Sequence, residues 1–319
     1  MLLRILTAIQ LTRLTMAFGA VSDIWFVILL TKAHQEYVMV DVYGMAMVAA
    51  LLAGAIVAVG LFAYGGSLND ILDVRHDSAF SPERPIPAGR IKVSQAVIVA
   101  VGALIVAVLG GAWMGTGAVC LTLLAAAGLL FYNATGKFIP SVGVVTVGLV
   151  HAVHMLVPNY QLTFLLPVWL VMTHAMVITA IVHVLEDKRP RLTSRAVVAV
   201  VIGWAVWSFL IIGAGGLREP GLWPEDANVL GLFYPLLAVI SFAFMAWWKT
   251  SRAGGRNAAE KLKRYGAMWQ SLYGAAWLLA IGLNTQAMWL GAFAVAGFMC
   301  MTLIRELTGL SGQPMTYRD

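Results

Sequence analysis

Three aspartates fall within eight residues in the stretch Asn69 to Gly89, NDILDVRHDSAFSPERPIPAG. On a helix, which advances about 100° per residue, Asp70, Asp73 and Asp77 lie within an arc of about 60°, and Asn69 widens it to about 100°. Carboxylates this close raise one another's pKa unless cations neutralise them. Carboxylate and amide oxygens are the ligands that Mg²⁺ takes in proteins. The stretch therefore predicts a Mg²⁺ site built from these four side chains.

Two further polar segments interrupt the apolar sequence. One is HVLEDKRP at residues 183–190, which carries His183, Glu186 and Asp187. The other is FYNATGKFIP at residues 131–140, which offers the Tyr132 phenol and the Lys137 ammonium. We expect both segments to face the same cavity as the aspartates.

The composition places these segments in a membrane protein. Of the 319 residues, 61% are hydrophobic and only 11% are charged, and the mean hydropathy is +0.85. These values lie well outside the usage of soluble globular domains. The two cysteines, Cys120 and Cys300, both sit in apolar runs, so no disulfide framework is indicated. The fold class expected is an all-α polytopic bundle of nine to ten transmembrane helices, forming a single domain over residues 1–319.

Runs of roughly 20 apolar residues, enough to cross a hydrocarbon core about 30 Å thick, mark the candidate spans. The first follows a basic head and is interpreted as a retained helix, since it is long for a signal peptide. The ten predicted ranges are 14–31, 43–65, 94–113, 116–132, 139–157, 161–185, 196–214, 229–248, 266–284 and 286–304.

Loop charge orients the predicted bundle. With a cytoplasmic N-terminus and ten crossings, all of the 21 Lys and Arg residues except Lys32 and Arg218 fall on the cytoplasmic side. This bias follows the positive-inside rule, so the net charge of +6 reflects topology and anionic membrane lipids, with no nucleic acid among the expected partners. All three polar segments then lie on the cytoplasmic side.

The motif residues resemble a known family. NDILDVRHD matches the NDxxDxxxD motif of the UbiA superfamily of intramembrane prenyltransferases, and the following RPIPAG is similar to that family's continuation. Tyr132 and Lys137 resemble the Tyr and Lys between the family's fourth and fifth helices. The resemblance covers the first six predicted spans, and the last hundred residues only as hydrophobic helices.

The resemblance implies a helix bundle around a central cavity that opens at the cytoplasmic side. It implies Mg²⁺ as cofactor, an isoprenyl diphosphate as donor and a small aromatic or lipid-soluble acceptor, usually an aromatic ring. Loss of diphosphate would leave an allylic cation that the acceptor attacks. The implied catalytic residues are Asp70, Asp73 and Lys137; the implied substrate contacts are Asn69, Arg84, Tyr132, Lys137 and His183; and the implied metal ligands are Asn69, Asp70, Asp73, Asp77, Glu186 and Asp187.

The family's second acidic motif, DxxxD, is incomplete in this sequence. Counting from Asp187, the second acid is replaced by Arg191, and counting from Glu186 it is replaced by Pro190. His183 and Asp187 are spaced to share one helix face. Either a second metal site is rebuilt from His183, Glu186 and Asp187, or it is weakened.

Polar residues within the predicted spans leave further possibilities open. Asp23 is expensive in lipid and should face the bundle interior, either to bind an acceptor or to form an interhelical hydrogen bond. His151, His154 and His174 could contact an acceptor or a metal, or form hydrogen bonds across helices. A secondary transporter or lipid carrier is the alternative function, although transporters gather such groups near the midplane rather than at one rim. A family member with a different lipid-linked role is a third possibility.

Overall fold

The computed structural model describes residues 11, 17–219, 221–225 and 227–310, and in this part of the chain every regular element is helical. The predicted all-α class is confirmed. Arg4, Arg13 and Arg318, and residues 14–16 of the first predicted span, lie outside the described residues. The elements are α2 (Phe18–Ala33), η2 (Gln35–Tyr37), α3 (Asp41–Gly44), α4 (Met47–Leu72), α5 (Val74–Phe80), α6 (Val93–Trp113), α7 (Thr116–Ala134), η3 (Gly136–Phe138), α8 (Pro140–Met155), α9 (Leu166–Leu185), α10 (Ser194–Gly216), η4 (Val229–Leu232), α11 (Phe233–Ser251), α12 (Gly255–Ala280) and α13 (Asn284–Leu310).

Seven stretches within the described residues are long and apolar enough to cross a membrane. They are α4, α6, α7, α9, α10, α11 together with η4, and α13 up to Ile304. The chain is thus a multi-pass membrane protein, but the predicted count of nine to ten spans is not confirmed. Two predicted spans form helices of only 16 residues, α2 and α8. Such a helix rises about 24 Å, less than the roughly 30 Å of the hydrocarbon core.

The helix of the ninth predicted span, α12, begins earlier than the sequence suggested. We expected a span at 266–284, but α12 starts at Gly255 and ends at Ala280. Its first turns therefore carry the charged residues that the prediction assigned to a loop. This difference places Lys263 on a packed helix, where its side chain is buried.

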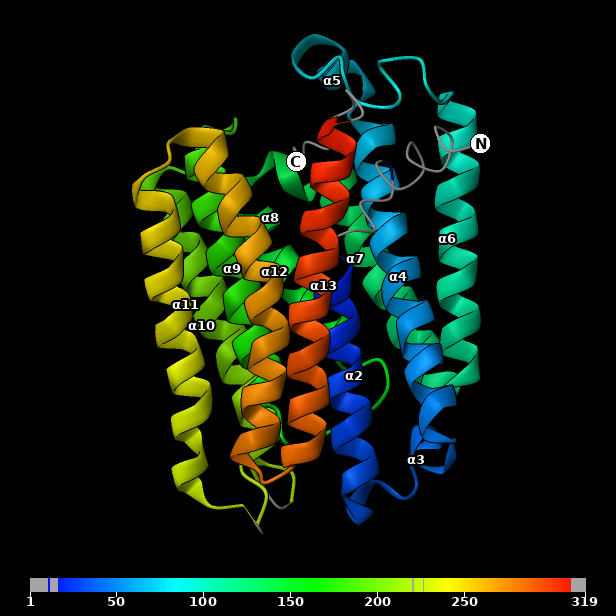
Figure 1. Cartoon of the computed structure of the whole chain (residues 1–319), viewed down its shortest axis with the longest axis vertical. Helices are drawn as coiled ribbons and strands as arrows, with labels where there is room; N and C mark the ends of the chain where they lie inside the picture. The colour runs from blue at the N-terminus through cyan, green and yellow to red at the C-terminus, as the bar shows by residue number, and fades with distance from the viewer. Residues whose placement is uncertain (1–10, 12–16, 220, 226, 311–319) are drawn as a thin grey trace.

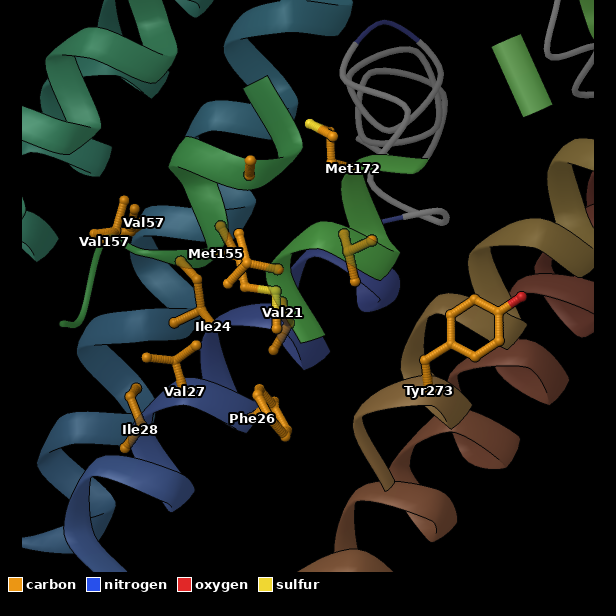
Figure 2. Close-up of a cluster of buried hydrophobic side chains, with 14 of the residues drawn as sticks. Val21, Ile24, Phe26, Val27, Ile28, Val57, Met155, Val157, Met172 and Tyr273 are labelled. Atoms are coloured by element: carbon orange, nitrogen blue, oxygen red, sulfur yellow. The ribbon is translucent and has the colours of Figure 1, made fainter. Parts of the chain in front are cut away.

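The core lies around α2, which packs against α4, α8, α12 and α13 (Figure 1). Figure 2 shows α2 side chains such as Ile24 and Phe26 in the same cluster as Val57 of α4 and Met172 of α9. Small residues allow close helix approach elsewhere: a Cβ on Gly60 of α4 would lie 2.8 Å from the Ala103 carbonyl oxygen of α6.

The outer helices expose apolar surface, as a bilayer requires. Very little of α10 is buried, and large side chains such as Phe209 on α10 and Trp247 on α11 are exposed. A helix that is apolar on all sides and exposed is stable only in an apolar solvent. Figure 1 shows α10 and α11 together at one side of the bundle.

Alternation of the helices brings the polar segments to one end of the bundle. Helix α4 leads up into α5, and Lys137, just before α8, reaches Asp73, so α8 begins at the same end (Figure 1). Helix α9 packs beside α8, and Glu186, which follows the last residue of α9, is paired with Lys263 near the start of α12. We call this end the α5 end.

Candidate functional site

The aspartates occupy a junction between two helices rather than one continuous helix. Helix α4 ends at Leu72 and α5 begins at Val74, with Asp73 between them at φ −94° and ψ 6°. The helical hydrogen-bonding pattern nevertheless continues, because the Asp73 amide donates to the Asn69 carbonyl at 3.0 Å and the Asp77 amide donates to the Asp73 carbonyl at 2.8 Å. The expected shared face is therefore broadly retained across the break.

Arg84 bridges two of the three aspartates. Its Nη1 lies 2.7 Å from Asp77 Oδ2 and 3.4 Å from Asp70 Oδ1, and its side chain is only 7% exposed. A tight turn brings it there, since the Arg84 amide donates to the Ser81 carbonyl. Burial raises the pKa of the Asp77 carboxyl above its usual range, and the Arg84 guanidinium counteracts part of that rise.

Lys137 neutralises the third aspartate. Its Nζ donates to Asp73 Oδ1 at 2.6 Å, which joins η3 to the α4–α5 junction over 64 residues of sequence. Tyr132 is half-buried on the last turn of α7, one loop before Lys137. The junction thus combines three carboxylates with two cations, which is an arrangement able to hold both a metal ion and a phosphate group.

The chemistry of this donor set fits Mg²⁺. Asn69, Asp70, Asp73 and Asp77 present only hard oxygen ligands, and one amide atom of Asn69, assigned as Nδ2, is buried without a hydrogen-bond partner. A half-turn of the terminal amide exchanges its nitrogen and oxygen, so this side chain can turn its oxygen toward an ion. No ready-made cage of three His, Cys, Asp or Glu side chains exists in the described part of the chain. A metal ion bound here would therefore displace Arg84 or Lys137 from the aspartates that they contact.

The second acidic segment has a different geometry from that expected. Helix α9 ends at Leu185, and Asp187 follows with a φ of 45°, so the prediction that His183 and Asp187 share a helix face is wrong. A left-handed residue ends the helix, a conformation that Asp tolerates better than most residues. His183 Nε2 instead contacts the Pro190 carbonyl at 2.9 Å. The Asp187 side chain is 67% exposed and pairs with Arg189 and Arg191.

Glu186 points into the bundle, where it meets a residue that sequence reasoning missed. Lys263 Nζ donates to Glu186 Oε1 at 3.0 Å, and both side chains are less than 10% exposed. Lys188 Nζ lies 3.3 Å from Glu186 Oε2, without the alignment of a hydrogen bond. The sequence signal that could have identified Lys263 is the run of charged residues before the ninth predicted span. A helix that starts at Gly255 carries these residues into the bundle.

Inside the bundle, several polar residues are paired across helices, whereas His154 Nε2 is buried without a hydrogen-bond partner among the described residues. Gln270 Nε2 of α12 donates to Asp23 Oδ2 of α2 and lies 2.9 Å from His151 Nδ1 of α8. His174 contacts the Gly266 carbonyl at 3.1 Å and the Tyr273 hydroxyl at 3.3 Å. The expected interior position of Asp23 is confirmed, and Gln270 is the partner that sequence reasoning did not name.

Comparison with known proteins gives four findings. The sequence matches the UbiA prenyltransferase family over residues 38–272. Digeranylgeranylglyceryl phosphate synthase of Saccharolobus solfataricus is 36% identical over 83 residues, a match that spans 26% of this chain and only 29% of that relative. A solved structure described for digeranylgeranylglyceryl phosphate synthase in membranes aligns with 87% of this chain and 98% of its own, at 16% identity and a TM-score of 0.56.

A second solved structure, a UbiA homologue from Aeropyrum pernix K1, aligns with 89% of this chain and 96% of its own, at 15% identity and a TM-score of 0.44. The first structural likeness shows a shared fold, and the family match spans well over half of the sequence. On these grounds the transporter alternative gives way to a transferase: the chain belongs to the UbiA prenyltransferase family of multi-pass membrane enzymes.

Proposed function

We propose that this protein transfers an isoprenyl group from an isoprenyl diphosphate to a lipid-soluble acceptor, in a Mg²⁺-dependent reaction at the α5 end of the bundle. The observation that carries the proposal is the convergence of Asp70, Asp73 and Asp77 with two cations, Arg84 and Lys137, from different segments. A diphosphate with its metal ions needs both kinds of partner in one place.

The chain's own residues have distinct roles in this proposal. Asn69, Asp70, Asp73 and Asp77 would hold Mg²⁺, which when bound neutralises the diphosphate and favours its departure. Arg84 and Lys137 donate hydrogen bonds to diphosphate oxygens as the bond from carbon to oxygen breaks and the leaving group takes the electron pair. The acceptor then forms a bond to the allylic cation and loses a proton.

The apolar helices supply the environment for this reaction. We propose a central cavity that opens at the α5 end, since surrounding apolar side chains would solvate the isoprenyl tail and exclude water that would quench the cation. Packing of α12 against α2, α9, α11 and α13 ties the last helices to the first, which supports a single domain over residues 1–319. The excess of Lys and Arg at the α5 end supports a cytoplasmic location for it.

Two acceptor classes remain candidates. The family resemblance favours an aromatic ring, whereas the name of the relative that is 36% identical over 83 residues favours a glyceryl phosphate. The likeness covers part of each chain, so the acceptor is decided by experiment. Isoprenyl diphosphates of several lengths are incubated with each acceptor class and the purified protein in detergent, and products are identified by mass spectrometry with and without Mg²⁺.

The proposal predicts prenylated product that requires Mg²⁺ and falls at least about 100-fold in Asp70→Ala, since that change removes a metal ligand. Glu83→Ala is the matched control, because Glu83 is an exposed carboxylate in the same segment. Absence of product with every acceptor, or full activity of Asp70→Ala, would contradict the proposal.

A further inference from the structure

We propose that a surface pocket at the turn between α11 and α12 binds the anionic headgroup of a membrane phospholipid. The pocket has a volume of about 350 Å³, and its lining includes Arg252, Asn257, Lys261 and Arg264. Sites for small molecules begin at about 300 Å³, so a headgroup with its phosphate fits this space. We call it the Arg252 pocket. Lipid binding there would be a second property of the chain, independent of the proposed reaction.

The lining of the Arg252 pocket is mostly cationic. Arg252, Lys261 and Arg264 share it with one carboxylate, that of Glu260. Arg264 already donates to Thr302 Oγ1 of α13 at 2.9 Å, so we assign ligand binding to the other two cations. Within the described residues, neither Arg252 nor Lys261 forms an ion pair with a carboxylate. Two cations that converge on one concave site attract an anion.

The segment around the pocket is basic in sequence as well. Residues 249–264 contain six Lys and Arg side chains but one acidic side chain. The positive-inside rule explains why a loop at this end of the bundle is basic. It does not explain why cations on both sides of the turn, Arg252 after α11 and Lys261 on α12, line the same hollow. That arrangement favours a bound ligand.

The Arg252 pocket lies at the depth of lipid headgroups. The apolar span that includes α11 ends at Ser251, one residue before Arg252. Just before this end are two exposed tryptophans, Trp247 and Trp248, and Trp side chains favour the boundary between bilayer and water. Lys249 Nζ lies 4.3 Å from the centroid of the Trp248 ring. The pocket therefore opens where the phosphates of a bilayer would be.

The outer face of α11 offers a surface for acyl chains. Leu236, Ile240, Phe244 and Trp248 are all exposed, and a spacing of four residues places each above the last on a helix. This apolar stripe leads toward Arg252, which follows Trp248 by four residues. A phospholipid with its phosphate in the pocket would lay its acyl chains along the stripe, whereas free phosphate would gain nothing from it. We therefore assign the ligand to a phospholipid.

The Arg252 pocket is separate from the aspartate junction. Figure 1 shows the turn between α11 and α12 at the same end of the bundle as α5, but α11 and α6 lie at opposite sides. If the α5 end is cytoplasmic, the pocket faces the leaflet in which anionic lipids create a negative surface potential. The diphosphate of a donor and the headgroup of a lipid would then occupy different places.

Lipid binding is measured by native mass spectrometry of the purified full chain in detergent. Phosphatidylglycerol is compared with phosphatidylcholine of the same acyl chains, and inorganic phosphate is added as a competitor. The proteins are the wild type, Arg252→Gln/Lys261→Gln and the conservative Arg252→Lys/Lys261→Arg. The matched control is Arg195→Gln/Arg256→Gln, because Arg195 and Arg256 are exposed cations outside the pocket and their loss changes the net charge equally.

We expect the wild type to prefer phosphatidylglycerol. Arg252→Gln/Lys261→Gln should weaken its binding about tenfold to thirtyfold, the effect of losing two cations near an anionic lipid. The conservative variant should retain most of the binding, and the matched control should stay within about twofold of the wild type because solvent and salt screen distant surface charges.

Equal binding of the two lipids by the wild type, an equal loss in the matched control, or displacement of the lipid by an equal concentration of inorganic phosphate would overturn the proposal. If the double variant does not fold, Arg252→Gln alone decides, since Arg252 is exposed beyond the end of α11. That variant should bind phosphatidylglycerol severalfold more weakly, and unchanged binding would again overturn the proposal. These measurements involve no turnover, so they stand apart from prenyl transfer.

Discussion

The two acidic segments at the α5 end differ in how their charges are balanced. At the α4–α5 junction, Arg84 contacts Asp70 and Asp77, and Lys137 contacts Asp73. In the second segment, buried Glu186 lies 3.0 Å from Lys263 and 3.3 Å from Lys188, whereas the Asp187 side chain is exposed. The first segment therefore gathers three carboxylates in one place, whereas the second keeps one buried carboxylate beside two lysines. The first segment has the oxygen ligands that Mg²⁺ takes, and the second offers fewer of them.

Loss of one junction aspartate should have the largest effect on activity. Asp73→Asn keeps the shape of the side chain but removes a metal ligand and the partner of Lys137. We expect Mg²⁺-dependent prenyl transfer to fall about 1000-fold, since electrostatic stabilisation of the leaving group is lost. Single-turnover rates at saturating donor test this. A rate within a few-fold of the wild-type rate would show that Asp73 is not part of the active site.

Removal of the bridging cation should have the largest effect on stability. Arg84→Met leaves Asp70 and Asp77 buried without their shared guanidinium. Breaking a buried ion pair from one side destabilises a protein by about 3–5 kcal/mol. Thermal unfolding in detergent should show a large loss of stability that added Mg²⁺ partly restores, because the ion replaces the missing charge. Loss of stability with no response to Mg²⁺ would argue against metal binding at the junction.

The interior polar cluster should show an intermediate effect. Gln270→Leu removes the donor that Asp23 and His151 share, and leaves a buried carboxylate without that hydrogen bond. A buried polar group that loses its partner costs about 1–3 kcal/mol. Thermal unfolding measures the change, with Gln270→Glu as a variant of similar size. If Gln270→Leu leaves the free energy of unfolding unchanged, water or another group must form the hydrogen bond with Asp23.

Asp187 should matter least for stability, in contrast to the neighbouring Glu186. Its side chain is mostly exposed and its partners, Arg189 and Arg191, are exposed as well. Surface ion pairs of this kind contribute about 0–1 kcal/mol. Asp187→Asn should therefore change the free energy of unfolding by less than about 1 kcal/mol, as measured by thermal unfolding in detergent. A larger loss would mean that Asp187 has a structural role that its exposure conceals.

Sequence reasoning succeeded where local spacing carries the information. The apolar runs located the long helices, and the spacing of Asp70, Asp73 and Asp77 indicated one clustered set of carboxylates. It also named Arg84 and Lys137, which the structure places against those aspartates.

The contacts that sequence reasoning missed join residues far apart in the chain. Glu186 and Lys263 are 77 positions apart, and Asp23 and Gln270 are 247 apart. No local pattern encodes such pairs, because they depend on which helices pack together. The extent of α12 was also hidden, since charged residues at the start of an apolar run resemble a loop until packing buries them.

Counting bound metal ions tests the contrast between the two segments most directly. Mn²⁺, which takes oxygen ligands as Mg²⁺ does, is titrated into the wild type, Asp73→Asn and Glu186→Gln in the presence of inorganic pyrophosphate, and free Mn²⁺ is followed by electron paramagnetic resonance. We predict that Asp73→Asn weakens Mn²⁺ binding at least about tenfold, the loss of one charged ligand, and that Glu186→Gln leaves the number of bound ions unchanged. Loss of a bound ion in Glu186→Gln, or unaltered binding in Asp73→Asn, would contradict this account.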